Sequence, residues 1–362
     1  MEIESLLTLC TVPGIGPRRI LALVAKFGSP EAVLRASVNE LCTVNGVDVR
    51  TASRIRTEAD RDFARDQLRR ANRLGVRFLT CWDEDYPARL KEISDPPVLL
   101  YVLGALSDAQ EIMLAVVGTR TPSTYGRVVT ENLCAELAER GITIVSGLAR
   151  GIDTIAHRTA LKAGGRTIAV LGSGVDVVYP PENRALARKI REGGALISEF
   201  PLGTQPEAPN FPRRNRIIGG MTVGTLVVEA GERSGALITA QLALEQNRDV
   251  FAVPGNITSE KSRGTNRLIK QGAKLVESAQ DILDEIRPQL PSLLRKAARL
   301  SRQPELDGIE KRVYESLSNE PRHIDDIAGS LGMDTGRVLA ALLSLELKNL
   351  ALQMTGKYFV RC

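Results

Sequence analysis

Three arginines within four residues form the densest candidate for binding chemistry in this sequence. They belong to the block Asn210-Phe211-Pro212-Arg213-Arg214-Asn215-Arg216. Guanidinium groups donate paired hydrogen bonds to phosphate oxygens, and an aromatic ring offers a face on which a nucleobase stacks. The block therefore predicts contact with a phosphate backbone and one stacked base, whereas the alternative is a solvated start of a helix. Its candidate residues are Phe211, Arg213, Arg214, Asn215 and Arg216.

Further basic residues could line the same site because of their place after short apolar runs. Glycines and small polar residues follow nearly every such run, as in 118–120 and 146–151. If the runs are parallel strands, these loops meet at one sheet edge, where glycine allows close backbone approach and helix N-termini favour anions. Single glycine turns can be purely structural, but together they predict an anion-binding edge. The candidates there are Arg120, Arg233, Arg263, Arg267 and Lys270.

Nucleotide cofactor chemistry is poorly supported. Arg120 stands where a G-x-G-x-x-G motif beginning at Gly118 would have its second glycine. The later turn Gly172-Ser173-Gly174 has Val177 in place of the third glycine, and no Walker A lysine is found. We therefore expect no nicotinamide or ATP cofactor.

Catalysis and metal binding are also not indicated. Asp153 and His157 are four residues apart, so one face of a helix could present both for acid–base work. We favour a helix-capping aspartate and a polar histidine at the sheet edge, and expect no catalytic residue. The two histidines and five cysteines are scattered, with no C-x-x-C pair, so we expect neither a metal site nor a disulfide framework.

Short apolar runs alternate with amphipathic segments between residues 105 and 286. The runs are 113–117, 142–145, 167–171, 195–197, 225–228 and 250–253. Continuous apolar strands separated by helices are typical of a parallel sheet that is covered on both faces. We therefore predict an α/β fold with a Rossmann-like, doubly wound parallel sheet over 105–286.

Residues 1–75 have the apolar spacing of helices and contain two glycine turns, each followed by a helix start. This pattern predicts a helix-hairpin-helix domain. The first turn could aim backbone N–H groups at a phosphate, whereas Asp48 in the second would repel one. A purely structural or protein-binding role is an equally open alternative. The secondary phosphate-contact candidates are Gly14, Gly16, Arg18 and Arg19.

The other segments differ from these two regions in turn content and charge. Residues 76–104 are rich in turns and are expected to bridge two domains. Residues 287–304 carry five basic residues and no acid, and are predicted to be a linker. Residues 305–362 have the helices and strand-turn-strand wing of a winged helix. Seven basic and nine acidic residues give this last unit a net charge of −2, which favours protein contact over groove reading.

The composition sets the broad class. With 362 residues, 43% hydrophobic and 25% charged, the chain is typical of two or three globular domains. No window approaches the ~18–20 apolar residues of a membrane span, and the start lacks signal-peptide features. We therefore expect a protein of the reducing cytoplasm that does not bind membranes. The net charge of +5 admits a polyanionic partner, and 4% aromatic residues argue against a broad stacking surface.

Seven stretches of the central region together resemble the DNA-processing protein A family (DprA, also called Smf). They are VVGTRTPSTYG (116–126), SGLARGIDTIAH (146–157), LGSGVDVVYPPEN (171–183), SEFPLGTQP (198–206), NFPRRNRIIGG (210–220), VVEAGERSGALITA (227–240) and VPGNITSEKSRGTN (253–266). The flanking helical and winged-helix regions resemble accessory domains of many members. The resemblance implies a non-catalytic, homodimeric protein that binds single-stranded DNA, protects incoming DNA in natural transformation and loads the RecA recombinase in homologous recombination.

The resemblance also implies a DNA pocket made of four parts. These are Arg120, the block 211–216, Arg233, and the segment 264–270, which contains Asn266, Arg267 and Lys270.

Two other functions stay open. Nucleoside-monophosphate phosphoribohydrolases share the superfold, and Glu229 and Glu232 lie near the turn where those enzymes carry a carboxylate. The spacing differs, because no acid follows Gly235. A scaffold for recombination proteins is the third possibility, and salt-sensitive DNA binding by the 105–286 fragment would argue against it.

Overall fold

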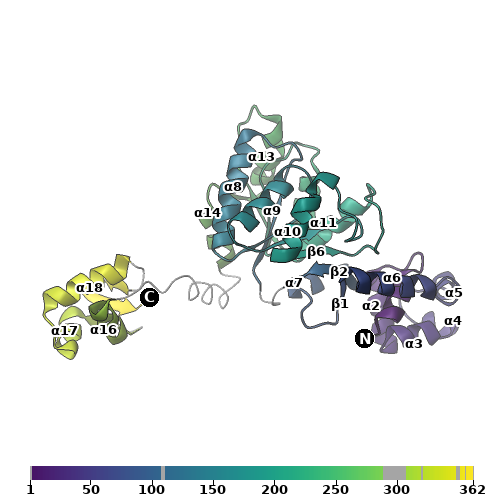
Figure 1. Ribbon diagram of the computed structural model, residues 1–362, viewed down its shortest axis with the longest axis horizontal. Coiled ribbons are helices and arrows are strands. Elements are labelled where there is room, and N and C mark those ends of the chain that lie inside the picture. Colours follow the sequence, from purple (N-terminus) through teal and green to yellow (C-terminus); the bar gives the residue numbers. More distant parts are fainter. Residues whose placement is uncertain are drawn as a thin grey trace. The chain divides into compact units, whose positions relative to one another are not determined.

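The structure is a computed structural model, which describes residues 2–106, 111–287, 307–318, 321–347, 351–354 and 356–361. The chain divides into two units, 1–294 and 295–362, and each is described by itself (Figure 1). Of the expected linker 287–304, only the first residue is among those described.

A nine-stranded sheet forms the centre of the first unit, in the order β1-β2-β6-β5-β4-β3-β7-β8-β9. The strands are β1 (Arg77–Thr80), β2 (Leu99–Gly104), β3 (Met113–Val117), β4 (Thr143–Ser146), β5 (Thr167–Val170), β6 (Gly194–Ser198), β7 (Gly224–Val227), β8 (Asp249–Ala252) and β9 (Lys274–Leu275). Strands β3 to β9 are parallel, whereas β2 pairs antiparallel with β1 and β6. The segment 76–104, expected as a bridge, therefore extends the sheet, because β2 pairs with the open edge of β6.

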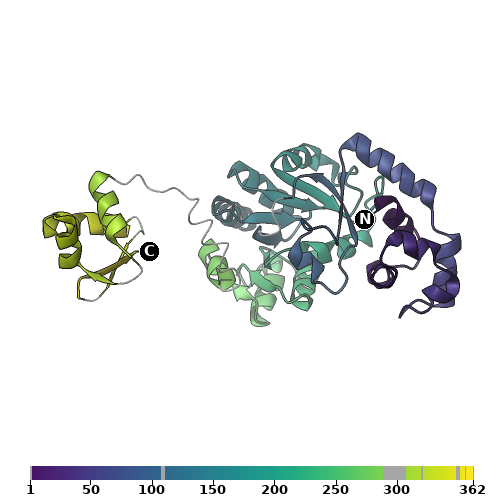
Figure 2. The same cartoon turned by 90° about the horizontal axis from the view of Figure 1, so that it is seen from below.

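Helices cover both faces of this sheet (Figure 2). Right-handed connections place α8 (Thr124–Glu139), α9 (Ile152–Lys162) and α10 (Arg184–Gly193) on one face. The opposite face carries α11 (Asn210–Gly220) and α12 (Gly235–Glu245), which pack on each other. Alternate residues of the buried strand β3 belong to two separate apolar cores, one on each face. The predicted doubly wound α/β fold is confirmed.

The chain reverses its direction of winding once. After β6 it crosses back over the sheet and adds β7 beside β3. The carboxyl ends of β3 and β7 are therefore neighbours at the switch point, where open parallel sheets bind ligands. The remaining short elements of this part are α7 (Ala88–Lys91), the 3₁₀ turns at Pro181–Asn183 and Glu260–Ser262, α13 (Arg263–Lys270) and α14 (Ala279–Ile286).

Six helices precede the sheet, as the helical spacing of residues 1–75 predicts. They are α1 (Ile3–Cys10), α2 (Pro17–Phe27), α3 (Pro30–Arg35), α4 (Val38–Leu41), α5 (Val49–Thr57) and α6 (Arg61–Leu74). Their apolar side chains share one core with the sheet, in which Leu6 and Leu9 are joined to Tyr101 and Leu171. The Gln67 side chain adds a polar link, since its Oε1 accepts from the backbone N–H of Leu202 at 2.8 Å. The helix-hairpin-helix region is thus fastened to the sheet.

The second unit has the three helices and the wing that the sequence predicts. The helices are α16 (Gly308–Ser316), α17 (Ile324–Leu331) and α18 (Thr335–Leu347), and the strands are β10 (Arg322–His323), β11 (Ala351–Met354) and β12 (Tyr358–Arg361). The strands pair in the order β10-β12-β11. Val313, Ile327, Leu342 and Phe359 are fully buried between them. The guanidinium of Arg361 lies over the Tyr314 ring, 4.1 Å from its centroid.

Within the described ranges, no helix is long and apolar enough to cross a membrane. The same residues contain no group of three or more histidine, cysteine or acidic side chains arranged for a metal ion.

Candidate functional site

The loops after the parallel strands meet at the carboxyl edge of the sheet. We call this edge the rim; it comprises 118–123, 147–151, 171–183, 199–209, 228–234 and 253–262. At the switch point the β3 and β7 loops are joined, because the N–H of Thr119 donates to the carbonyl oxygen of Glu229 at 2.8 Å. The rim candidates fall into two groups of side chains.

The first group surrounds the half-exposed ring of Phe211 at the start of α11. The exposed Arg120 guanidinium lies over this ring, 5.8 Å from its centroid. Tyr179, from the loop after β5, approaches it with 6.1 Å between ring centroids. Gly172 is required below the ring, since a Cβ there would be 2.9 Å from a ring carbon of Phe211. An aromatic surface with a cation beside it can stack a base and bind its phosphate.

Arg214 does not belong to the accessible surface, contrary to its predicted role. Its side chain is buried, and Nη1 donates to the carbonyl oxygens of Gly147, at 2.7 Å, and Val170. Burial lowers the pKa of Arg214 to about 10, although the nearby Asp153 carboxylate opposes this shift. Asn215 accepts from Nε of Arg214 at 3.0 Å and so helps to position it. Arg214 therefore fastens α11 beneath the rim.

Arg216 is also held inside the protein. It pairs with the buried Glu199, with 2.5 Å between Nη2 and Oε2, and with Asp95 at 3.4 Å. Burial raises the pKa of Glu199, and the Arg216 charge counteracts this rise. Of the three arginines in the block, only Arg213 is exposed; its guanidinium lies over Phe200 at 5.1 Å. Arg120 is therefore the exposed cation beside Phe211, and Arg213 is the exposed cation beside Phe200.

Asp153 already occupies the anion-binding loop after β4. One carboxylate oxygen accepts from the backbone N–H groups of Gly147, at 3.1 Å, and Ala149, at 3.2 Å. Burial raises the pKa of Asp153, and the charge of Arg214 lowers it. The loop amides are thus satisfied by the protein's own carboxylate. The expected helix-capping role is wrong, because the cap position of α9 is Gly151 and Asp153 bonds the loop before the helix instead.

His157 lies elsewhere than expected. It is fully buried in the sheet-facing side of α9, with 2.6 Å between Nδ1 and Oγ1 of Thr167. Burial lowers its pKa to about 3. The expectation of a histidine at the rim is wrong, because Thr167 begins β5 at the amino edge of the sheet.

The second group of basic residues gathers around Glu232 in the β7 loop. Nη1 of Arg263 is 3.9 Å from its carboxylate, and Nη2 of Arg267 donates to its carbonyl oxygen at 3.5 Å. Arg233 and Lys270 are exposed. Asn266 instead faces inward, where its amide both donates to and accepts from the backbone of Gly255. Four predicted cations are therefore accessible here, and Asn266 shapes the loop after β8.

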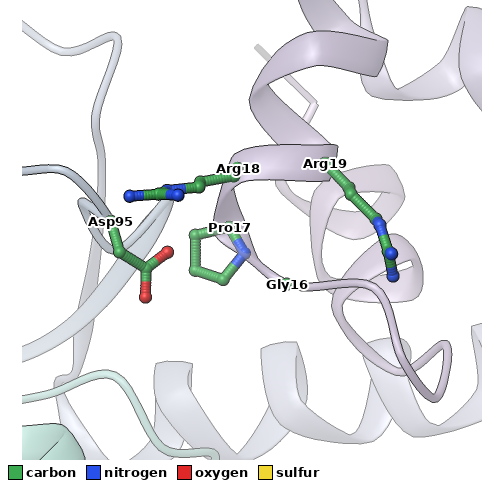
Figure 3. Close-up of a pocket in the computed structure, with 5 residues that line it drawn as sticks. All are labelled: Gly16, Pro17, Arg18, Arg19 and Asp95. Carbon is green, nitrogen blue, oxygen red and sulfur yellow. The ribbon is translucent and has the colours of Figure 1, made fainter. Parts of the chain in front are cut away.

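The first N-terminal hairpin forms a pocket of about 390 Å³, lined by Gly16, Pro17, Arg18, Arg19 and Asp95 (Figure 3). Arg18 points toward the Asp95 side and donates from Nε to the carbonyl oxygen of Ser94 at 2.6 Å. Arg19 turns the other way and donates to the carbonyl oxygen of Gly14 at 2.6 Å. Asp95 makes this pocket less favourable for an anion than the two glycines alone suggest.

The second hairpin holds its own acid at the helix start. The Asp48 carboxylate accepts from the N–H of Thr51 at 2.7 Å and caps α5. Because this hydrogen bond favours the ionised form, the pKa of Asp48 is lowered. A phosphate would meet a carboxylate here, as the sequence predicts.

The model of DNA recombination-mediator protein A matches residues 77–287, more than half of the chain. The chain belongs to this family. The models of the DprA winged-helix domain and of the SAM-like helix-hairpin-helix tandem match residues 296–357 and 6–61. The resemblance drawn from the sequence is thereby confirmed.

Relatives and solved structures of this family match between 59% and 97% of the chain. Protein Smf of Synechocystis is 36% identical over 97% of this chain and 96% of its own length. The X-ray structure of DNA processing protein A from Streptococcus pneumoniae covers 79% of this chain and 98% of its own, at 36% identity and a TM-score of 0.69. DNA processing protein A from Helicobacter pylori, described for its unique single-stranded DNA binding mode, covers 59% and 97%, at 28% identity and a TM-score of 0.52.

One aromatic residue of the rim, Tyr179, was missed in the sequence analysis. It follows a cluster of glycines and precedes two prolines, in Gly172–Pro181. A large aromatic residue in a loop of this composition is a signal for an exposed ring. With an exposed fraction of 37%, its ring is a second accessible aromatic surface beside Phe211.

Proposed function

We propose that this recombination-mediator chain binds single-stranded DNA along the rim. The observation that carries the proposal is the accessible cluster of Arg120, Phe211 and Tyr179, to which the exposed Arg213 adds a cation over Phe200. Bases would stack on the two rings, while the arginines neutralise phosphates. The similarity to the Helicobacter pylori protein supports this choice of ligand.

Single-stranded DNA fits this site better than a duplex. The rim is built of glycine-rich loops and offers two accessible aromatic rings, on which the unpaired bases of a single strand can stack, whereas the bases of a duplex are already stacked inside it. Little sequence selectivity is expected, because stacking and phosphate contacts accept any base.

We further propose that the chain acts as a homodimer, protects incoming DNA in natural transformation and loads RecA onto it for homologous recombination. Family membership supports this role. Sedimentation at micromolar concentration tests the dimer. Recruitment of purified RecA onto DNA coated with single-strand-binding protein, with and without this chain, tests the loading step.

Fluorescence anisotropy with matched single- and double-stranded oligonucleotides tests the DNA binding itself. We expect preference for the single strand, and a log–log salt slope of about −0.7 for each phosphate neutralised. Equal or tighter binding to the duplex would contradict the proposal.

The hydrolase alternative has less support from the geometry. The Glu229 carboxylate is buried and accepts from both the backbone N–H, at 2.8 Å, and the hydroxyl of Ser123. The carboxylate also packs against Gly126, where the Cβ of any other residue would be 2.2 Å from Oε2 of Glu229. This carboxylate holds the start of α8 and is buried.

A further inference from the structure

A basic helix face lies outside every site described so far. On α10, Leu186, Ala187 and Ile190 are buried against the core. The opposite side exposes Arg184, Arg188 and Arg191, spaced four and three residues apart and therefore aligned along one face. Among the described residues, these three arginines form no salt bridge.

The neighbouring helix widens this face. α9 packs along α10 and exposes Arg158 and Lys162, again one helical turn apart. The acid nearest the start of α10, Glu182, is paired with Arg150. On α10 itself, the exposed Glu192 follows Arg191, and the exposed Lys189 balances it. Positive charge is therefore in excess over these two helices.

The face begins at the rim. β5 ends there and β6 starts at the opposite edge of the sheet, so α10 runs from the rim to the amino edge. The loop that leads into α10 carries Tyr179, whose ring contacts Phe211. Arg184, Arg188 and Arg191 thus lead away from the aromatic cluster, with successive steps of about 6 and 4.5 Å along the helix axis.

The chemistry of this face favours a polyanion over a protein. Within the described residues, no large apolar side chain is exposed on α9 or α10. A protein interface needs a desolvated core of apolar and aromatic residues, whereas a phosphate chain needs only a row of cations.

We propose that a single strand of DNA leaves the rim at Tyr179 and continues along α10, with its phosphates on Arg184, Arg188 and Arg191. This inference rests on the proposed function, because the strand must first be bound at the rim. It extends the binding path from the loops to a helix that none of the rim candidates includes.

The test compares two lengths of oligothymidylate, about 6 and about 25 nucleotides, so that only the longer one extends beyond the rim. The variant R184Q/R188Q/R191Q should bind the short strand as the wild type does. For the long strand we expect at least a tenfold loss of affinity and a salt slope that is smaller by about 2, since three phosphates contribute about 0.7 each. An unchanged thermal midpoint would show that the fold is intact.

Two further variants serve as controls. R184K/R188K/R191K keeps the charge and should keep most of the long-strand affinity. K311Q/R337Q/K357Q removes three exposed charges from the winged-helix unit and should leave both lengths unaffected.

The outcomes separate this inference from the proposed function. Unchanged long-strand binding by the α10 variant would overturn the inference and leave an acidic protein as the partner for this face. Equal losses for both lengths would also overturn it, because α10 would then belong to the rim itself. Failure of the wild type to bind either length would contradict the proposed rim site itself.

Discussion

The guanidinium of Arg120 lies over the ring of Phe211, 5.8 Å from its centroid, and the two residues are 91 positions apart in the chain. The loop after β3 supplies the cation and the start of α11 supplies the ring. Their meeting depends on the winding of the sheet, which brings loops from separate strands to one edge. The rim therefore combines an aromatic surface with positive charge.

Replacing Phe211 should weaken single-stranded DNA binding without unfolding the chain. We expect Phe211→Ala to cost roughly 1–3 kcal/mol of binding free energy, if one base stacks on the ring. Phe211→Leu fills more of the space above Gly172 but lacks an aromatic face, so it should bind almost as weakly. Anisotropy titrations measure both, and wild-type affinity of the leucine variant would exclude stacking at this position.

Substitutions of Arg213 and Arg214 should have different effects, one on DNA affinity and the other on stability. Arg213→Ala should weaken DNA binding tenfold or more and leave the thermal midpoint unchanged, because this side chain is exposed. Arg214→Ala should lower the free energy of unfolding by about 3–5 kcal/mol, because it leaves the buried Asp153 without its cation. Urea unfolding and anisotropy on both variants separate the roles. A stable Arg214→Ala chain that fails to bind DNA would instead support the sequence-based prediction that Arg214 contacts a phosphate.

No release of free base from nucleoside monophosphates should be detected. The Glu229 carboxylate is occupied by Ser123, so it lacks an open position beside a ribose. Glu229→Gln should therefore lower the thermal midpoint. Chromatography of nucleotides after long incubation provides the measurement, and base release that disappears in Glu229→Gln would establish the hydrolase.

The buried His157 should make stability depend on pH. Its folded pKa of about 3 lies below the ordinary value of 6.5, so the unfolded chain binds the proton first. Its contribution is fully present above pH 6.5 and is lost as the pH falls toward 3. The slope should approach about 1.4 kcal/mol per pH unit below pH 6.

Urea unfolding between pH 7 and about 5 tests this slope, since the raised pKa of Asp153 acts with the opposite sign at lower pH. Stability of His157→Gln should vary less over the same range. Identical slopes for both chains would show that another group titrates.

Removing the winged-helix unit should leave most DNA affinity. A chain that ends at residue 303 loses a unit with a net charge of −2 and an apolar exposed side chain, Leu343, on α18. We expect affinity within about a factor of three, or about 0.65 kcal/mol. A hundredfold loss in a folded dimer would show that the winged helix binds DNA.

The parallel strands β3 to β8 were predictable because each is a short apolar run, and strands of this kind are buried on both faces. The edge strand β9 was not predicted, because it has only two residues, Lys274 and Leu275, and both are exposed. The position of β2 in the sheet was not predictable, although Val98–Val102 is equally apolar. Strand β2 pairs with β6, which lies almost 100 residues further along the chain. Local pattern identifies a strand more readily than its neighbour.

Which arginines of the block 210–216 face inward could be predicted only after the block was assigned to a helix. In α11, Asn210, Arg214, Ile217 and Ile218 are buried and share one face at the helical period. That spacing places Arg214 inward and leaves Arg213 outside, so the signal was present once the block was assigned to a helix. The burial of Arg216 was not predictable, since it depends on Glu199 and Asp95 from other segments.

Asp153 occupies one place on the rim where the phosphate of a free nucleotide could bind. The amides of Gly147 and Ala149, which could hold the phosphate of a free nucleotide, are already bonded to this carboxylate. A mononucleotide could use only the contacts of one base and its phosphate on the rim, whereas a polymer adds many such contacts in series. Chain length is then the feature by which the rim would favour a DNA strand over a free nucleotide such as ATP.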